Sequence, residues 1–264
     1  MHKVLVWFAA AALVAAALLG ARSASAVVGG TDDTTGQFPS AGVLQLQDGG
    51  EWFDYCSGTL VASNVVLTAA HCVDFLGPGD VRVTFDAAPD AGSTYYHADH
   101  FSIPAAWLAA GPCFGNSKHA CLSPGHEDIA LIWLDTDVSG VTPSEIADRG
   151  YLDRLRLTRQ TFTVVGYGVD DFITGSLLAN HPVVVVDGVR SYRNVTAITK
   201  QDAFPDRFLK VTKSVCFGDS GGPVFHRGVI VALNTWTFST RCDGPNLEYR
   251  VDSAPAQAFL DANL

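Results

Sequence analysis

The sequence predicts an all-β protein, because short apolar runs alternate with turn residues such as Asp48-Gly49-Gly50 and Gly77-Pro78-Gly79. Abundant Gly, Val and Thr also favour strands over helices. Many short strands separated by such turns are typical of a β-barrel or a β-sandwich. We expect strands at 42–46, 58–62, 65–69, 81–85, 129–134, 161–165, 182–186, 195–198, 208–212, 229–233 and 248–251.

Two segments have helical features. Residues 142–145 read Thr-Pro-Ser-Glu, a capping box with proline at the first helical position, which predicts a short helical turn ending by Gly150. Residues 253–264 carry apolar side chains near helical spacing, so we expect a terminal helix packed on the body. The stretch from about 136 to 160, between the strand clusters, is expected to connect two domains.

Residues 1–26 have the pattern of a secretory signal peptide. Lys3 precedes an apolar run from 4 to 19, and Ala24-Ser25-Ala26 forms a small-residue cleavage site. The alternative is an uncleaved membrane anchor, but the run is short and lacks a stop-transfer pattern. We therefore expect a secreted, extracellular protein that begins at Val27 and has no membrane attachment after cleavage.

Composition limits the classes of partner. The 264 residues are 48% hydrophobic and 17% charged, enough for one large domain or two small ones. The formal net charge is −10, and removing residues 1–26, with Lys3 and Arg22, makes the mature part still more negative. Such a charge argues against nucleic acid as a partner and is typical of a solvated acidic surface.

Six cysteines predict disulfides in an exported chain. They are Cys56, Cys72, Cys113, Cys121, Cys216 and Cys242. The sequence alone permits about 15 connectivities, of which sequential pairing is the simplest. A zinc site is the alternative, but there is no Cys-x-x-Cys and the histidines are scattered, so we expect no metal and no cofactor.

Residues 218–223 read Gly-Asp-Ser-Gly-Gly-Pro, which suits a tight turn where backbone N–H groups converge near the Ser220 hydroxyl. Acyl transfer needs this geometry, a nucleophile beside donors for the developing oxyanion. A Gly-rich surface turn is the alternative. His71 follows an apolar run and Asp128 precedes another; an aspartate can accept the histidine N–H and fix its tautomer. Alternatively, each is an ordinary surface, core or turn residue.

The order His, Asp, Ser, set in Thr-Ala-Ala-His-Cys at 68–72, Asp-Ile-Ala-Leu at 128–131 and the 218–223 string, resembles the chymotrypsin/trypsin-like serine proteases. The resemblance covers residues 27–264 and suggests a secreted, bacterial-type member. Further matches are Val27-Val28-Gly29-Gly30, Val164-Val165-Gly166-Tyr167-Gly168 and Thr235-Trp236.

The resemblance implies two six-stranded antiparallel β-barrels with the active site between them. The N-terminal barrel is expected at 27–140, with a connection to about 160, the C-terminal barrel at 161–252 and the helix at 253–264. It also implies disulfides Cys56–Cys72 and Cys216–Cys242. Cys113–Cys121 has no counterpart in the family; we expect this third pair to close a long loop that borders the substrate cleft.

The resemblance also implies a role for each site residue. Ser220 is the expected nucleophile, His71 the general acid and base, and Asp128 the group that orients His71. The N–H groups of Gly218 and Ser220 are expected to form the oxyanion hole. Thr235 carries a hydroxyl where the family usually has a serine beside the buried aspartate.

Activation in the family pairs a new N-terminal amine with the aspartate before the nucleophile. Here that pair is Val27 and Asp219, and signal-peptide removal alone would expose Val27. We therefore expect activation on export, without a zymogen stage.

The specificity pocket departs from the trypsin-like pattern. The expected base is Ser214 rather than an aspartate, and Thr237 and Asn246 stand where wall glycines are usual; Thr235 and Trp236 complete the lining. These side chains narrow the pocket, so we expect cleavage after small or medium apolar residues.

Taken together, the sequence predicts a secreted, monomeric serine endopeptidase that acts on protein or peptide substrates. Protein inhibitors of proteases are further expected partners. Two alternatives remain: a catalytically silent, protease-like binding protein and an esterase on the same scaffold.

Overall fold

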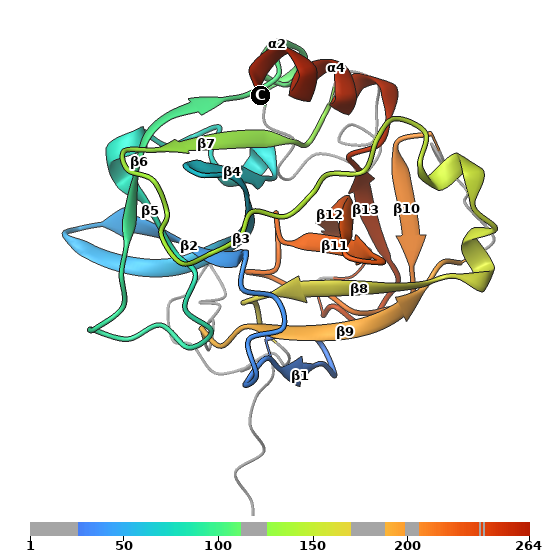
Figure 1. Ribbon diagram of the computed structural model, residues 1–264, viewed down its shortest axis with the longest axis horizontal. Helices are drawn as coiled ribbons and strands as arrows, with labels where there is room; N and C mark the ends of the chain where they lie inside the picture. Colours follow the sequence, from blue (N-terminus) through green and yellow to red (C-terminus); the bar gives the residue numbers. More distant parts are fainter. Residues whose placement is uncertain (1–25, 112–125, 170–187, 199–205, 238, 240) are drawn as a thin grey trace, which may run out of the picture.

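The computed structural model describes residues 26–111, 126–169, 188–198, 206–237, 239 and 241–264. These residues form two curled antiparallel sheets that lie side by side, with a helix across one end (Figure 1). The predicted signal peptide up to residue 25, the Cys113–Cys121 pair and the strand expected at 182–186 lie outside the described residues. Among the described residues, no helix has the length and apolar character needed to span a bilayer.

The first sheet closes into a six-stranded barrel, in the spatial order β2-β3-β4-β7-β6-β5. The β2–β3 hairpin turns at Gly49 and Gly50, whose φ values of 59° and 93° favour glycine at both positions. The strands are β2 (Ala41–Asp48), β3 (Glu51–Ala62), β4 (Val65–Thr68), β5 (Val81–Thr84), β6 (Tyr96–Ser102) and β7 (Ala130–Leu134).

The second sheet has seven strands, in the order β1-β9-β8-β11-β12-β13-β10. Backbone bonds from Ile198 N to Lys210 O (2.9 Å) and from Thr212 N to Thr196 O (3.1 Å) join the end of β9 to β10, so that β8 to β13 curl into a second barrel. The strands are β1 (Thr31–Asp32), β8 (Thr161–Gly166), β9 (Ser191–Thr196), β10 (Phe208–Val211), β11 (Pro223–His226), β12 (Val229–Thr237) and β13 (Asn246–Arg250).

The fold class is therefore confirmed: the protein is all-β and ends in a helix. Helix α4 (Ala254–Asn263) is capped by Ser253, whose hydroxyl accepts a bond from Ala256 N. Sequence patterns missed β6, whose residues are largely polar, and β11, which begins at a proline. They also missed β1, which extends the second sheet beyond six strands, and the short helix α2 (Ala105–Ala110).

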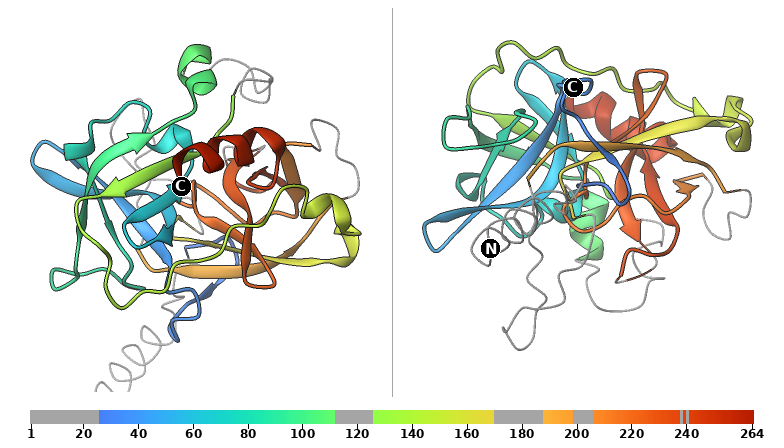
Figure 2. Two further views of the ribbon diagram at one scale, coloured as in Figure 1. Left: turned by 45° about the horizontal axis from the view of Figure 1, so that its top comes forward. Right: turned by 90° about the horizontal axis from the view of Figure 1, so that it is seen from below.

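The helical turn expected at 142–145 is absent, because neighbouring barrels bond the backbone of this segment. Ser144 N donates to Leu60 O of β3, and Ala147 N donates to Ile230 O of β12, both at 2.9 Å. Ile146 forms an isolated bridge with Ile230. The connection therefore runs extended along both barrels (Figure 2), and its short 3₁₀ helices come later, at Leu152–Arg154 and Leu157–Arg159.

A buried ion pair also ties the two barrels together. Arg190, directly before β9, lies 2.8 Å from Asp33 through its Nε, and both side chains are almost fully buried. The same guanidinium donates to the carbonyl oxygens of Ala41 (3.1 Å) and Phe85 (2.9 Å), which belong to the first barrel. Because Arg190 belongs to the second sheet, one cation satisfies groups on both sides of the interface.

Replacing Arg190 with methionine should destabilise the protein, because it leaves the Asp33 carboxylate buried without its counter-charge. We expect a loss of about 3–5 kcal/mol in the free energy of unfolding, measured by urea denaturation. Arg154→Met is the matched control, since Arg154 pairs with Asp148 at the same 2.8 Å but on the surface, and we expect it to change stability little. Equal losses in the two variants would contradict this assignment.

Candidate active site

Antiparallel pairing of β4 with β7 brings His71 and Asp128 together. Thr68, at the end of β4, pairs with Ala130, at the start of β7. His71 lies three residues beyond Thr68 on a 3₁₀ helix (Ala70–Cys72), and Asp128 lies two residues before Ala130. The register of one strand pair therefore places an imidazole beside a carboxylate.

Two bonds join these residues. His71 Nδ1 lies 2.8 Å from Asp128 Oδ2, and the His71 backbone N–H donates to Asp128 Oδ1 at 3.1 Å. The Asp128 side chain is only 1% exposed. Because an ionised carboxylate can only accept, Nδ1 carries a proton, which leaves Nε2 of the neutral imidazole as the acceptor. The ring is thus oriented to take a proton at Nε2.

The surroundings of His71 act on its pKa in opposite directions. Burial of the ring lowers the pKa, while the charge and hydrogen bond of Asp128 and the charge of Asp74 raise it. The net result is a raised pKa, so the carboxylates stabilise the imidazolium more than burial opposes it.

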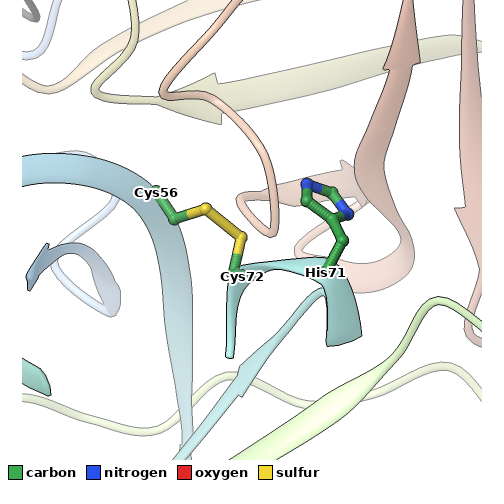
Figure 3. Close-up of side chains that lie close together, drawn as sticks. All are labelled: Cys56, His71 and Cys72. Carbon is green, nitrogen blue, oxygen red and sulfur yellow. A yellow bond between two sulfur atoms is a disulfide. The ribbon is translucent and has the colours of Figure 1, made fainter. Parts of the chain in front are cut away.

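A disulfide holds the backbone beside His71. Figure 3 shows the Cys56–Cys72 bond, which links β3 to the 3₁₀ helix that carries His71. The sulfur atoms and an imidazole nitrogen lie within 4.8 Å of one another, a grouping that could suggest a metal centre. The two sulfurs are bonded to each other, so neither offers the thiolate that zinc prefers.

The loop that carries Ser220 packs directly against the first barrel. Ser57 N of β3 donates to Ser220 O at 2.8 Å, and Cys72 Sγ lies 3.6 Å from the same oxygen. A Cβ at Gly221 would lie 2.0 Å from Thr68 Oγ1, and the φ of Gly221 is +79°. Only glycine permits this approach. It places Ser220 beside Cys72, the residue that follows His71.

Within the described ranges the Ser220 hydroxyl makes no hydrogen bond, either to His71 or to another group. Catalytic hydrogen bonds are often long without substrate and tighten when substrate binds. The structure thus places the three residues at one site. The His71–Asp128 hydrogen bond is formed there and the Ser220–His71 hydrogen bond is not.

The backbone N–H groups of Gly218 and Ser220 have no acceptor in the part of the chain that the structure describes. Their neighbours are bonded: Asp219 N donates to Cys216 O (3.2 Å) and Gly221 N to Asn234 O (2.8 Å). Two unpaired donors in an otherwise bonded loop provide the arrangement that an oxyanion hole requires.

Asp219 is fully buried and accepts two backbone bonds in the uncleaved chain. Its Oδ2 accepts from Cys216 N at 2.8 Å and its Oδ1 from Gly168 N at 2.9 Å. Val27 is also fully buried, in the apolar cluster that contains Val215. The nitrogen of Val27 is still part of a peptide bond to Ala26, so an ion pair with Asp219 requires cleavage.

The expected pocket residues are joined by hydrogen bonds that centre on Asn246. Asn246 Oδ1 accepts from Ser214 N at 2.9 Å, and its Nδ2 donates to Val215 O and Trp236 O. Ser214 and Asn246 are both fully buried, whereas Trp236 and Thr237 are half-buried. The second disulfide, Cys216–Cys242, begins at the residue after Val215.

Thr235 lies at a bulge of β12, because the pairing of β12 with β13 shifts register between Asn234 and Trp236. Its hydroxyl donates to Leu247 O of β13 at 2.8 Å.

Glu248, a carboxyl on the strand that carries Asn246, was not predicted as a site residue. Glu248 is fully buried; its Oε2 accepts from Thr235 N at 3.1 Å, and within the described residues its Oε1 has no partner. Burial raises the pKa of Glu248 well above its usual value, Asp219 adds to the rise and the Thr235 bond opposes it. The available signal was a carboxyl inside an expected strand, 248–251.

Comparisons with known proteins agree with this geometry. The family model described as Trypsin matches residues 27–260. A chymotrypsin-like serine proteinase of Haliotis rufescens is 27% identical over 243 residues. The alignment covers 86% of this chain and 88% of the Haliotis protein. The vitellin-degrading protease of Bombyx mori is 26% identical over 219 residues, covering 79% and 76%.

Among solved structures, human heparin binding protein superposes with a TM-score of 0.66 at 20% identity, covering 89% of this chain and 95% of its own. At that identity the likeness concerns the fold alone. The two sequence relatives above are animal proteins and leave the expected bacterial-type origin unconfirmed.

Replacing Asp128 with asparagine should lower the pKa of His71, because burial then acts with less opposition. In the wild type the folded pKa exceeds the unfolded one, so the linked stabilisation is present below the unfolded value and lost as pH rises through the folded value. Titration of the His71 ring followed by NMR measures the shift.

Asp99→Asn is the control, since Asp99 lies 2.8 Å from His100 in an exposed pair. We expect it to leave the His71 titration unchanged. An unaltered His71 pKa in Asp128→Asn would contradict the assignment.

Proposed function

The chain belongs to the trypsin family, and we propose that it is a secreted serine endopeptidase that hydrolyses proteins or peptides as a monomer. The observation that carries the proposal is the buried His71–Asp128 pair at 2.8 Å, beside a loop that presents Ser220 and two unpaired N–H groups. A nucleophile, a base, an orienting group and oxyanion donors are the parts that acyl transfer needs.

Each part has a defined step. His71 Nε2 accepts the proton of Ser220 Oγ as that oxygen attacks the scissile carbonyl. The N–H groups of Gly218 and Ser220 bind the resulting oxyanion. Imidazolium then gives its proton to the leaving amine, which breaks the C–N bond and leaves an ester on Ser220. Water, deprotonated by His71, hydrolyses that ester and restores the enzyme.

We place the preference at small or medium apolar residues before the scissile bond. Support comes from Asn246, which bonds both Ser214 and Val215 and so occupies the base of the expected pocket. Burial that raises the pKa of Glu248 favours its neutral form, which offers no negative charge to a Lys or Arg side chain.

Activation by export fits the same geometry. Val27 is buried in the cluster of Val215, and Cys216, the next residue, donates to the Asp219 carboxylate at 2.8 Å. Cleavage after Ala26 creates an amine in this region, and a buried ammonium needs a counter-charge. Asp219 is the carboxylate we assign to it.

Two alternatives belong to other classes. A silent binding protein is one, and a structural neighbour is by name a heparin binding protein. The net charge of −10 disfavours a polyanion such as heparin for this chain. An esterase is the other, and its chemistry would use the same residues on a smaller substrate.

We expect the mature protein to react with a phosphonofluoridate at Ser220, to cleave casein, and to cut a peptide library mainly after small or medium apolar residues. Ser220→Ala should lose the label and lower kcat by roughly 10⁶-fold. No labelling of the wild type would favour the binding protein. Turnover of small esters without casein cleavage would favour the esterase, and cleavage mainly after Lys or Arg would refute the preference.

N-terminal sequencing of secreted protein should give Val27 as the first residue. One alanine inserted after Ala26, so that the new amine stands one residue further out, should abolish activity while the protein still folds, as circular dichroism can show. Asp219→Asn should do the same, because the buried amine then lacks its counter-charge; Asp148→Asn, on the surface, is the control. A secreted protein whose first residue is not Val27 would contradict activation by export.

A further inference from the structure

We infer that Ser57, a residue of the first barrel, is a positioning residue for the oxyanion hole: its side chain fixes the peptide that links the two donor-bearing peptides of the nucleophile loop. This inference rests on the proposed function. Ser57 lies on β3, directly after Cys56, and its side chain is fully buried.

The proton of the Ser57 hydroxyl has one hydrogen-bond acceptor among the two partners of Ser57 Oγ. Tyr167 N donates to Ser57 Oγ at 3.1 Å, and a backbone N–H can only donate. A serine hydroxyl has one proton to give, and Ser57 Oγ lies 2.9 Å from Gly218 O, which can only accept. The hydroxyl therefore accepts from Tyr167 and donates to Gly218.

This bond acts on the peptide between Gly218 and Asp219. Its oxygen is held by Ser57 Oγ, and its nitrogen donates to Cys216 O at 3.2 Å. The preceding peptide is held through Phe217 O, which accepts from Val169 N at 3.0 Å. The peptides on either side of the Gly218–Asp219 peptide carry the unpaired N–H groups of Gly218 and Ser220, so its orientation sets the angle between the two donors.

The loop has reason to need such a constraint. Gly218 has a φ of +93°, a region that glycine enters without cost and also leaves easily. A peptide next to a glycine can rotate unless both of its polar groups are bonded. Oxyanion stabilisation depends on donors held in place before the reaction, so rotation here costs rate rather than substrate affinity.

Ser57 itself cannot move readily. Its N–H donates to Ser220 O at 2.8 Å, and its carbonyl accepts from Thr68 Oγ1 at 2.8 Å. Every polar group of Ser57 is thereby bonded, and two of those bonds reach the nucleophile loop. A strand of one barrel thus sets the geometry of donors that belong to the other.

The test compares mature wild type, Ser57→Ala and Ser40→Ala on one fluorogenic peptide taken from the library. Ser40→Ala is the matched control, since it removes a buried serine hydroxyl that bonds Ser144 Oγ, on the connection between the barrels, at 2.7 Å. We expect Ser57→Ala to lower kcat by about 10- to 100-fold with little change in KM, a smaller effect than the roughly 10²–10³ of losing a donor itself. Ser40→Ala should stay within about twofold of wild type.

A second readout separates positioning from mere support of the fold. A peptide aldehyde of the same sequence forms an oxyanion on the serine, whereas an analogue with methylene in place of the scissile carbonyl does not. Ser57→Ala should lose aldehyde affinity in proportion to kcat and keep affinity for the methylene analogue. If Ser57→Ala does not fold, Ser57→Gly removes the same hydroxyl with less bulk and carries the same expectation.

Unchanged kcat in a folded Ser57 variant, equal loss of both affinities, or an equal fall of kcat in Ser40→Ala overturns the inference alone. A wild type that neither cleaves peptides nor binds the aldehyde overturns the proposed function and this inference with it.

Discussion

The site depends on one close approach, that of the nucleophile loop of the second barrel to β3 and β4 of the first. At Gly221 the two backbones are so near that a Cβ would lie 2.0 Å from Thr68 Oγ1 and 2.5 Å from Ser57 O. The same approach puts Ser220 O within hydrogen-bond distance of Ser57 N. His71 and Asp128 belong to the first barrel and Ser220 to the second, so they meet only while this contact holds.

Other contacts hold the two barrels in the relative position that this close approach requires. The Arg190 guanidinium bonds Asp33 and two carbonyls of the first barrel, and the extended connection bonds Leu60 on one side and Ile230 on the other. Buried polar groups between the barrels are satisfied only in the docked arrangement, which disfavours sliding of one barrel on the other.

Features encoded in short strings were predictable from the sequence. His71, Asp128 and Ser220 each lie in a short contiguous motif. Most strands and the C-terminal helix also follow from patterns of neighbouring residues. Contacts that depend on the folded chain were not predictable. Ser57 and Arg190 bond groups far along the chain, and Glu248 bonds Thr235 across the β12–β13 pair. A local signal also failed where a tertiary bond competed, since Leu60 O of the first barrel accepts the Ser144 N–H of the 142–145 capping box.

Strand β1 has a consequence for the order in which the molecule can assemble. It lies at the start of the described chain yet pairs with β9, through Thr31 with Tyr192 and Asp32 with Ser191. The first barrel has all its strands once residue 134 is made, whereas the N-terminal segment must wait for a strand synthesised much later. Pairing of such long range is slow to form, so docking of the N-terminal segment and completion of the second barrel become a single late event in folding.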